Sequence, residues 1–167
     1  SGANWTTTFA AAPGLNTILV RQTDVAGNVS IGTAFDFTFD TSADAPSAVL
    51  ANDTGASATD LLTRNGQLSV TGLETGATVQ YQLNAGTTWS SSFTPVQGLN
   101  TVRVRQLDAA GNASTFTTVV FTFDSIAAAP RVALATDTGK SATDKITSNG
   151  SLAVTATETG ATVQYST

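Results

Sequence analysis

The octapeptide Glu74-Thr75-Gly76-Ala77-Thr78-Val79-Gln80-Tyr81 occurs twice in this chain, and its second copy runs unchanged from Glu158 to Tyr165. It belongs to a repeat that spans the whole sequence. When the 167 residues are shifted against themselves by 84 positions, 83 residues are paired without a gap, and 46 of these pairs are identical. A period of this length with no insertion indicates a tandem array in which each repeat is one domain.

Within one repeat, apolar and polar residues alternate over short segments. Leu68 and Val70 alternate with polar neighbours, and Val119, Phe121 and Phe123 share one face of a later segment. A period of two predicts half-buried strands, and several short strands separated by turn residues are typical of a sandwich. The sequence therefore predicts an all-β fold of tandem Ig-like β-sandwich domains, with about seven strands per repeat.

Proline marks the expected domain boundaries. Ala45-Pro46 and Ala129-Pro130 lie one period apart, just after phenylalanine-rich segments that end at Asp40 and Asp124. Proline lacks the amide hydrogen that a central strand needs, so it favours a boundary at these points. We expect three parts, namely the C-terminal part of a repeat at residues 1–44, a complete repeat at 45–125 and the N-terminal part of a repeat at 126–167.

The two terminal parts together carry the strand set of one domain, joined in the wrong chain order. Both ends of the sequence are thus expected to fall within repeats, as in a segment of a longer array. A split sandwich exposes unpaired strand edges unless another copy pairs with them. We therefore expect the terminal parts of neighbouring copies to complete one another, head to tail.

Composition excludes several classes of function. The chain has no His and no Cys, so an imidazole base, a thiolate nucleophile and an ordinary zinc site are absent, and we expect no enzymatic activity. Its net charge of −5 argues against nucleic acid as a partner, because phosphates require a basic face. No apolar run approaches the roughly 18 residues that a membrane-spanning helix needs.

The acidic residues follow the repeat. Ten of the twelve form five pairs one period apart, and only Asp36 and Asp44 are unmatched. In an Ig-like sandwich, Glu74 and Asp108 would belong to the loops of one pole, and Asp53, Asp60 and Asp124 to the other. Stacking such domains end to end brings the recurring carboxylates to the joints, where like charges repel one another.

A hard divalent cation with six to eight oxygen ligands would relieve this repulsion. Calcium is favoured over magnesium because loops of different domains offer a large, irregular oxygen cage. Side-chain amides such as those of Asn112 and Asn65 are suitable further ligands. The candidate ligands are Asp24, Asp40, Asp53, Asp60, Glu74, Asp108, Asn112, Asp124, Asp137, Asp144 and Glu158. For any one of them the alternative is a structural role, in which the side chain only bonds to its own turn.

Two segments carry a resemblance to a known family. Asp108 to Ser114, with the pattern DxAGNxS, and Asp137 to Thr147, with the pattern DTGxSxTDxxT, together resemble the bacterial Ig-like repeats of giant surface adhesins of the biofilm-associated type. The resemblance covers the whole chain. It implies an extracellular stalk on the bacterial surface or in a secreted protein, with calcium ions stiffening the joints. The implied partners are neighbouring repeats of the same chain, and other domains would bind a host or surface ligand.

Two other functions stay open. The chain could be a glycan- or self-binding module of a biofilm matrix, with Trp5 and Trp89 as stacking platforms, although a Trp at a fixed repeat position more often serves packing. It could also be a filament subunit that assembles by strand complementation.

Overall fold

The computed structural model describes residues 4–167, and these contain strands and no helix, which confirms the all-β fold. None of the described residues therefore forms a helix that could cross a membrane. The chain divides into two units, Ser1–Asp124 and Ser125–Thr167.

The first unit begins with an antiparallel hairpin. Its strands are β1 (Gly14–Val20) and β2 (Thr33–Phe39), and their register runs from Gly14↔Phe39 to Val20↔Thr33. The side chain of Asn16 fastens the chain that enters β1, because it accepts from the amide of Ala12 and donates to the carbonyls of Ala12 and Gly14.

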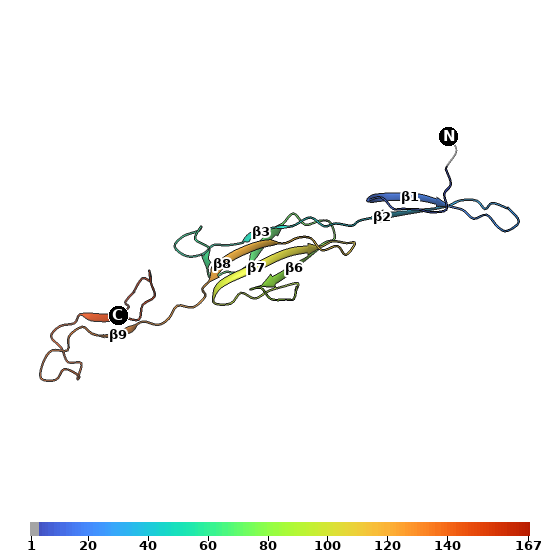
Figure 1. Ribbon diagram of the computed structural model, residues 1–167. Helices are drawn as coiled ribbons and strands as arrows, with labels where there is room; N and C mark the ends of the chain where they lie inside the picture. Colours follow the sequence, from blue (N-terminus) through green and yellow to red (C-terminus); the bar gives the residue numbers. More distant parts are fainter. Residues whose placement is uncertain (1–3) are drawn as a thin grey trace. The chain divides into compact units, whose positions relative to one another are not determined.

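The complete repeat follows in the same unit and forms two sheets (Figure 1). The smaller sheet pairs two antiparallel strands, β3 (Ser47–Leu50) and β5 (Leu68–Thr71). The larger sheet has the order β4-β8-β7-β6, with β4 parallel to β8 and the other neighbours antiparallel. Its strands are β4 (Leu62–Thr63), β6 (Thr78–Leu83), β7 (Gly98–Leu107) and β8 (Thr117–Phe123).

The core of this repeat lies between the two sheets. Val102 and Val104 of β7 are fully buried, and Val119 and Phe121 of β8 are nearly so. Apolar side chains of β3, β5 and β6 pack against them, so the predicted inward row of β8 does face a partner sheet. Alternation along β7 is complete, because every second residue from Asn100 to Gln106 is buried.

The complete repeat has six strands rather than about seven. The segment expected to form a strand around Trp89 makes only an isolated bridge between Tyr81 and Ser90. Asn84 and Ala85 lie before it with φ angles of 48° and 57°, a left-handed turn that leads the chain away from β6. The following residues, from Thr87 to Ser92, carry no apolar alternation that a sheet face would select.

The second unit contains one short sheet. Its antiparallel strands are β9 (Arg131–Leu134) and β10 (Leu152–Thr155), which repeat β3 and β5 one period later in the same register. Residues 162–167, which correspond to the whole of β6, form no strand in this unit.

Candidate metal centre

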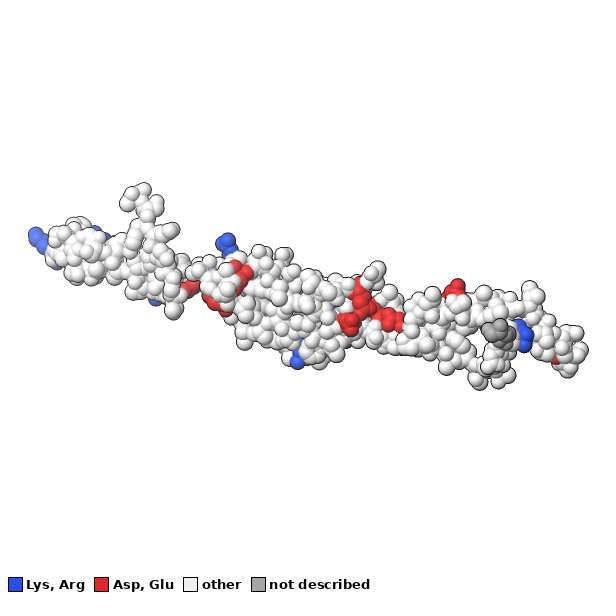
Figure 2. All heavy atoms as spheres, turned by 90° about the horizontal axis from the view of Figure 1, so that it is seen from above, with Lys and Arg blue, Asp and Glu red and all other residues white. Residues whose placement is uncertain are grey.

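Three carboxylates of the first unit converge at one place. Ligand oxygens of Asp40, Glu74 and Asp108 all lie within 4.8 Å of one another. Asp40 follows β2, Glu74 lies in the turn between β5 and β6, and Asp108 follows β7. In the sequence, the first residue belongs to one repeat and the other two belong to the next. Figure 2 shows acidic side chains gathered in a few patches on a surface with little other charge.

The turn after β7 fixes the position of Asp108. Its Oδ1 atom accepts from the amides of Ala110 and Asn112, at 2.9 and 2.8 Å, and its Oδ2 atom accepts from the Asn112 side chain at 2.8 Å. Gly111 allows the reversal with a φ of 94°. The Asn112 side-chain bond is the main cause that lowers the pKa of Asp108, and backbone amides add to it against the opposing effect of burial. The carboxylate is therefore held in its charged form.

Asn112 also connects the two repeats. Its Nδ2 atom donates to the backbone carbonyl of Asp40 at 3.1 Å as well as to Asp108. The side chain predicted as a ligand thus holds two members of the cluster together. In this arrangement its amide oxygen is the atom that could bind a cation.

Glu74 is held by the linker and by a buried amide. Its Oε1 atom accepts from the amide of Asp44 at 2.7 Å, and its own amide donates to Oε1 of Gln106 at 2.9 Å. The Nε2 atom of Gln106 donates to the Asp44 carbonyl at 2.6 Å. Gln106 is fully buried, so the linker between the repeats is fastened to β7 through one uncharged side chain.

Gln106 was not among the predicted site residues. The signal was present, since Val20-Arg21-Gln22 recurs as Val104-Arg105-Gln106. A Gln that continues the inward series of two valines in a strand requires a buried hydrogen-bond partner. That partner comes from a linker distant in sequence, which a periodicity argument does not reveal.

The Asp24 turn repeats the Asp108 turn without the cluster. Oδ1 of Asp24 accepts from the Asn28 amide at 2.7 Å, and Oδ2 accepts from the Asn28 side chain at 2.8 Å. These bonds, the Asn28 side-chain bond first, also lower the pKa of Asp24. Among residues 4–167, Asp24 does not belong to a cluster of three acidic groups. The Asp24 side chain therefore bonds to its own turn, which is the structural role given above as the alternative to metal binding.

Asp53 and Asp60, predicted as ligands at the opposite pole, accept hydrogen bonds from backbone amides of a loop. Oδ2 of Asp53 accepts from the amide of Leu61 at 2.8 Å, and Oδ1 of Asp60 accepts from the amide of Leu62 at 3.1 Å. Leu61 has a φ of 60°, a strained value for a side chain of this size, which these bonds help to hold. Oδ1 of Asp53 is buried with no hydrogen-bond partner. The second unit repeats this arrangement at Asp137 and Asp144, with the same unpartnered Oδ1 atom in Asp137.

Asp53, Asp60 and Asp124 do not form a cluster of three acids within residues 4–167. Oδ1 of Asp124 accepts from the Gln97 side chain at 3.0 Å. Glu158 repeats the linker contact of Glu74, because its Oε1 atom accepts from the amide of Ala128 at 2.7 Å. Of the predicted ligands, the structure thus brings together Asp40, Glu74 and Asp108, with Asn112 beside them.

The donor set fits a hard cation. Three carboxylates and an amide oxygen are the ligand types that calcium prefers. Part of each acidic side chain already accepts hydrogen bonds, but a carboxylate oxygen has more than one lone pair. Asp40 is exposed and Glu74 is half-buried, so water can supply the remaining ligands. Three carboxylates this close repel one another, and a bound cation would offset that repulsion.

The tryptophans have one ring face covered. The guanidinium of Arg105 lies 4.1 Å from the ring centroid of Trp89, and that of Arg21 lies 3.8 Å from the ring of Trp5. Nε of Arg105 also donates to the side chain of Gln80 at 2.9 Å. Cation–π packing within the repeat therefore occupies one face of each tryptophan ring.

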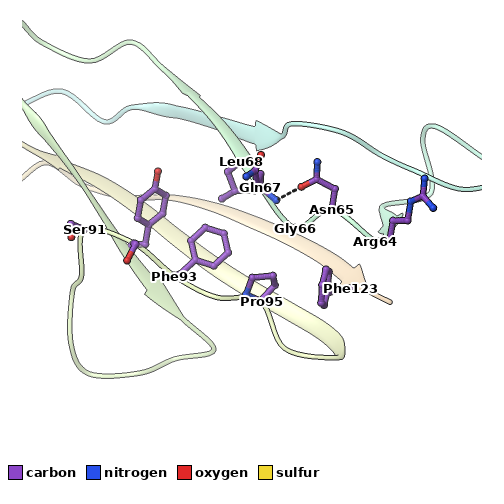
Figure 3. A pocket seen from close by; sticks show the side chains of 11 residues that line it. Arg64, Asn65, Gly66, Gln67, Leu68, Ser91, Phe93, Pro95 and Phe123 are labelled. Carbon is purple, nitrogen blue, oxygen red and sulfur yellow. Dashed lines mark hydrogen bonds between the residues drawn. The ribbon is translucent and has the colours of Figure 1, made fainter. Parts of the chain in front are cut away.

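A hollow of about 490 Å³ lies elsewhere in the complete repeat (Figure 3). The rings of Tyr81 and Phe93, whose centroids are 5.1 Å apart, line it together with Phe123. Asn65 and Gln67 line its polar side and are joined by a 3.1 Å bond from the Gln67 amide to the Asn65 side chain. Aromatic rings beside amides are a combination that sugars can contact.

No model of a known protein family matches this chain, and no curated protein matches it.

Proposed function

We propose that this chain is a stalk segment of a large extracellular bacterial adhesin, in which calcium stiffens the joint between successive repeats. The observation that carries the proposal is the cluster of Asp40, Glu74 and Asp108, because two repeats contribute to it. When bound, the cation supplies positive charge that offsets the repulsion among the carboxylates. A cation held by both repeats is lost when they separate, so binding stabilises the closed joint.

The protein's own contacts prepare this joint. Asn112 holds the end of the first repeat against the Asp108 turn, and Gln106 fastens the linker to the second repeat. These bonds set the distances among the acids before a cation enters. Because the ligands are already in place, little conformational entropy is lost when the cation binds. The expected dissociation constant is roughly 0.1 to 1 mM, the range typical of extracellular calcium modules.

Calorimetric titration of the full chain with calcium tests the proposal. Asp40→Asn removes one carboxylate of the cluster and should weaken binding about tenfold or more, since each lost charge–cation contact is worth at least ~1.4 kcal/mol at close range. Asp36→Asn is the matched control, because Asp36 is an exposed acid of β2, four residues before Asp40, and has no place in the cluster. Equal binding by the two variants, or no saturable heat from the unsubstituted chain, would contradict the proposal.

A second candidate function is glycan binding at the hollow of the complete repeat. Tyr81, Phe93, Asn65 and Gln67 supply the rings and amides that favour it. Saturable binding of soluble oligosaccharides that Phe93→Ala abolishes would support this function, and Phe116→Ala is the matched control at an aromatic residue outside the hollow. Absence of saturable binding across a panel of acidic and neutral glycans would remove it.

A further inference from the structure

The outer face of the larger sheet in the complete repeat carries two arginines side by side. Arg103 and Arg105 alternate with buried valines along β7, so both side chains leave the sheet on the face away from the core. They are two residues apart in the strand, which separates their Cα atoms by about 6.6 Å. The four strands of this sheet and the connection from residue 84 to residue 97 contain no other charged residue.

Uncharged partners orient both guanidinium groups. Nη1 of Arg103 donates to Oε1 of Gln82 at 3.1 Å, and Nε of Arg105 donates to Oε1 of Gln80 at 2.9 Å. Neither arginine forms an ion pair within residues 4–167. Asp108 lies three residues beyond Arg105, but its carboxylate accepts three hydrogen bonds from its own turn. Both positive charges are therefore left without a counter-charge in the described part of the chain.

Aromatic rings pack against the same two guanidinium groups. The guanidinium of Arg103 lies 4.7 Å from the ring centroid of Phe116, and that of Arg105 lies 4.1 Å from the ring centroid of Trp89. The two ring centroids are 6.2 Å apart, so these four side chains form one continuous cluster, which we call the arginine face. Phe116 is 47% exposed. Stacking holds the planar groups in place, so a ligand would lose little free energy in ordering them.

We propose that the arginine face binds the carboxylate groups of an acidic polysaccharide. A guanidinium can donate two parallel hydrogen bonds to one carboxylate, and such charge-assisted bonds are stronger than neutral ones. A uronic acid sugar carries a carboxylate and an apolar C–H face on the same ring. One sugar unit can therefore contact a guanidinium and an aromatic ring together. Nucleic acid fits less well, because a chain with a net charge of −5 repels a densely charged duplex.

The preceding repeat has only half of this arrangement. Arg21, one period before Arg105, lies over the ring of Trp5 in the same way, but Leu19 occupies the position of Arg103. The repeat therefore accepts a leucine at this strand position. No residue of the arginine face belongs to the acid cluster or lines the hollow, so the inference rests on neither function proposed above.

Calorimetric titration of the full chain with a soluble oligogalacturonate tests the inference. A chelator is present throughout, because calcium binds carboxylate oxygens and would bridge sugar and protein. Arg103→Leu should weaken binding about tenfold or more, the effect of losing a hydrogen bond between charged groups. Arg103→Lys keeps the charge and loses the planar fork, so it should weaken binding less. Arg21→Gln is the matched control and should leave the affinity unchanged, because Arg21 is stacked on a tryptophan without a second arginine two residues before it.

Two further measurements support or overturn the proposal. Binding should weaken as the salt concentration rises, and a neutral oligosaccharide of the same length should not bind. Equal affinity of Arg103→Leu and the unsubstituted chain would overturn the proposal, and so would the absence of saturable binding. Weakening by Arg64→Gln in place of Arg103→Leu would overturn it as well, because Arg64 lines the hollow. Tighter binding of duplex DNA than of oligogalacturonate would show that the ligand is not a polysaccharide.

Discussion

The β1–β2 hairpin and the β7–β8 hairpin are one period apart and have the same local structure in different surroundings. Gly14 pairs with Phe39 as Gly98 pairs with Phe123, and the two Asp turns carry the same hydrogen bonds. Within residues 4–167, only the second hairpin is covered by a partner sheet and has further acids beside its turn. The comparison teaches that hairpin and turn are encoded locally, whereas the core and the candidate metal centre depend on segments distant in sequence.

The largest difference between the hairpins should be in how much the loss of an apolar side chain lowers the free energy of unfolding. Phe121→Ala removes a ring that is 1% exposed and should lower the free energy of unfolding of the complete repeat by about 3–5 kcal/mol. The matched change Phe37→Ala, one period earlier, should cost far less, because that side chain is only half-buried. Urea unfolding followed by Trp89 fluorescence, in a Trp5→Phe background, measures the first effect. Equal costs in the two hairpins would break the comparison.

The buried amide should give the next largest difference. Gln106→Leu leaves the Glu74 amide and the Asp44 carbonyl without their partner, which should cost about 1–3 kcal/mol. Gln22→Leu is the control, because Gln22 is exposed and lies one period earlier. Chemical unfolding of both variants checks this. If Gln106→Leu is neutral, then the fastening of the linker to β7 contributes no stability.

The Asp24 and Asp108 turns, unlike the apolar faces of the two hairpins, should respond alike to substitution. Asp24 and Asp108 both have a pKa below the ordinary 3.8, chiefly through Asn28 and Asn112. A carboxylate whose pKa is lower in the folded chain than in the unfolded chain stabilises the fold at pH values above the unfolded-state pKa. This stabilisation is lost as the pH falls through the folded-state pKa. Asn28→Ala and Asn112→Ala should each raise the pKa of the neighbouring Asp, as NMR titration of the side-chain carboxyl carbons would measure. A variant with no shift would show that the side-chain bond is not the main cause.

The strand pattern was predictable because alternation has a direct physical meaning. Val119 and Phe121 had to face a core, and they do. The strand expected around Trp89 is only a bridge, since the turn at Asn84 and the polar residues after it leave no face for a sheet to bury. A repeated aromatic residue indicates a fixed contact, and here that contact is with Arg105 on the strand.

The set of acids that lie close together was only partly predictable from the sequence. The repeat pattern predicted Asp40, Glu74 and Asp108 as ligands, but it also predicted Asp24, whose turn shares the DxAGNxS pattern and has no cluster within residues 4–167. Repeat position fixes the local turn equally in every copy. Whether a carboxylate reaches others depends on which repeat lies next to it. Gln106 was missed for the same reason, because its partners come from the linker.

The distribution of distances between the two repeats shows whether calcium stiffens the joint. Spin labels on Thr33→Cys in β2 and Thr118→Cys in β8 occupy exposed sites in the two repeats that share the cluster, and no native cysteine competes. Calcium should narrow the distribution measured by pulsed electron paramagnetic resonance. Asp108→Asn should abolish the narrowing, whereas Asp24→Asn should preserve it. A distribution of equal width with calcium and with chelator would contradict the claim that a cation stiffens this joint.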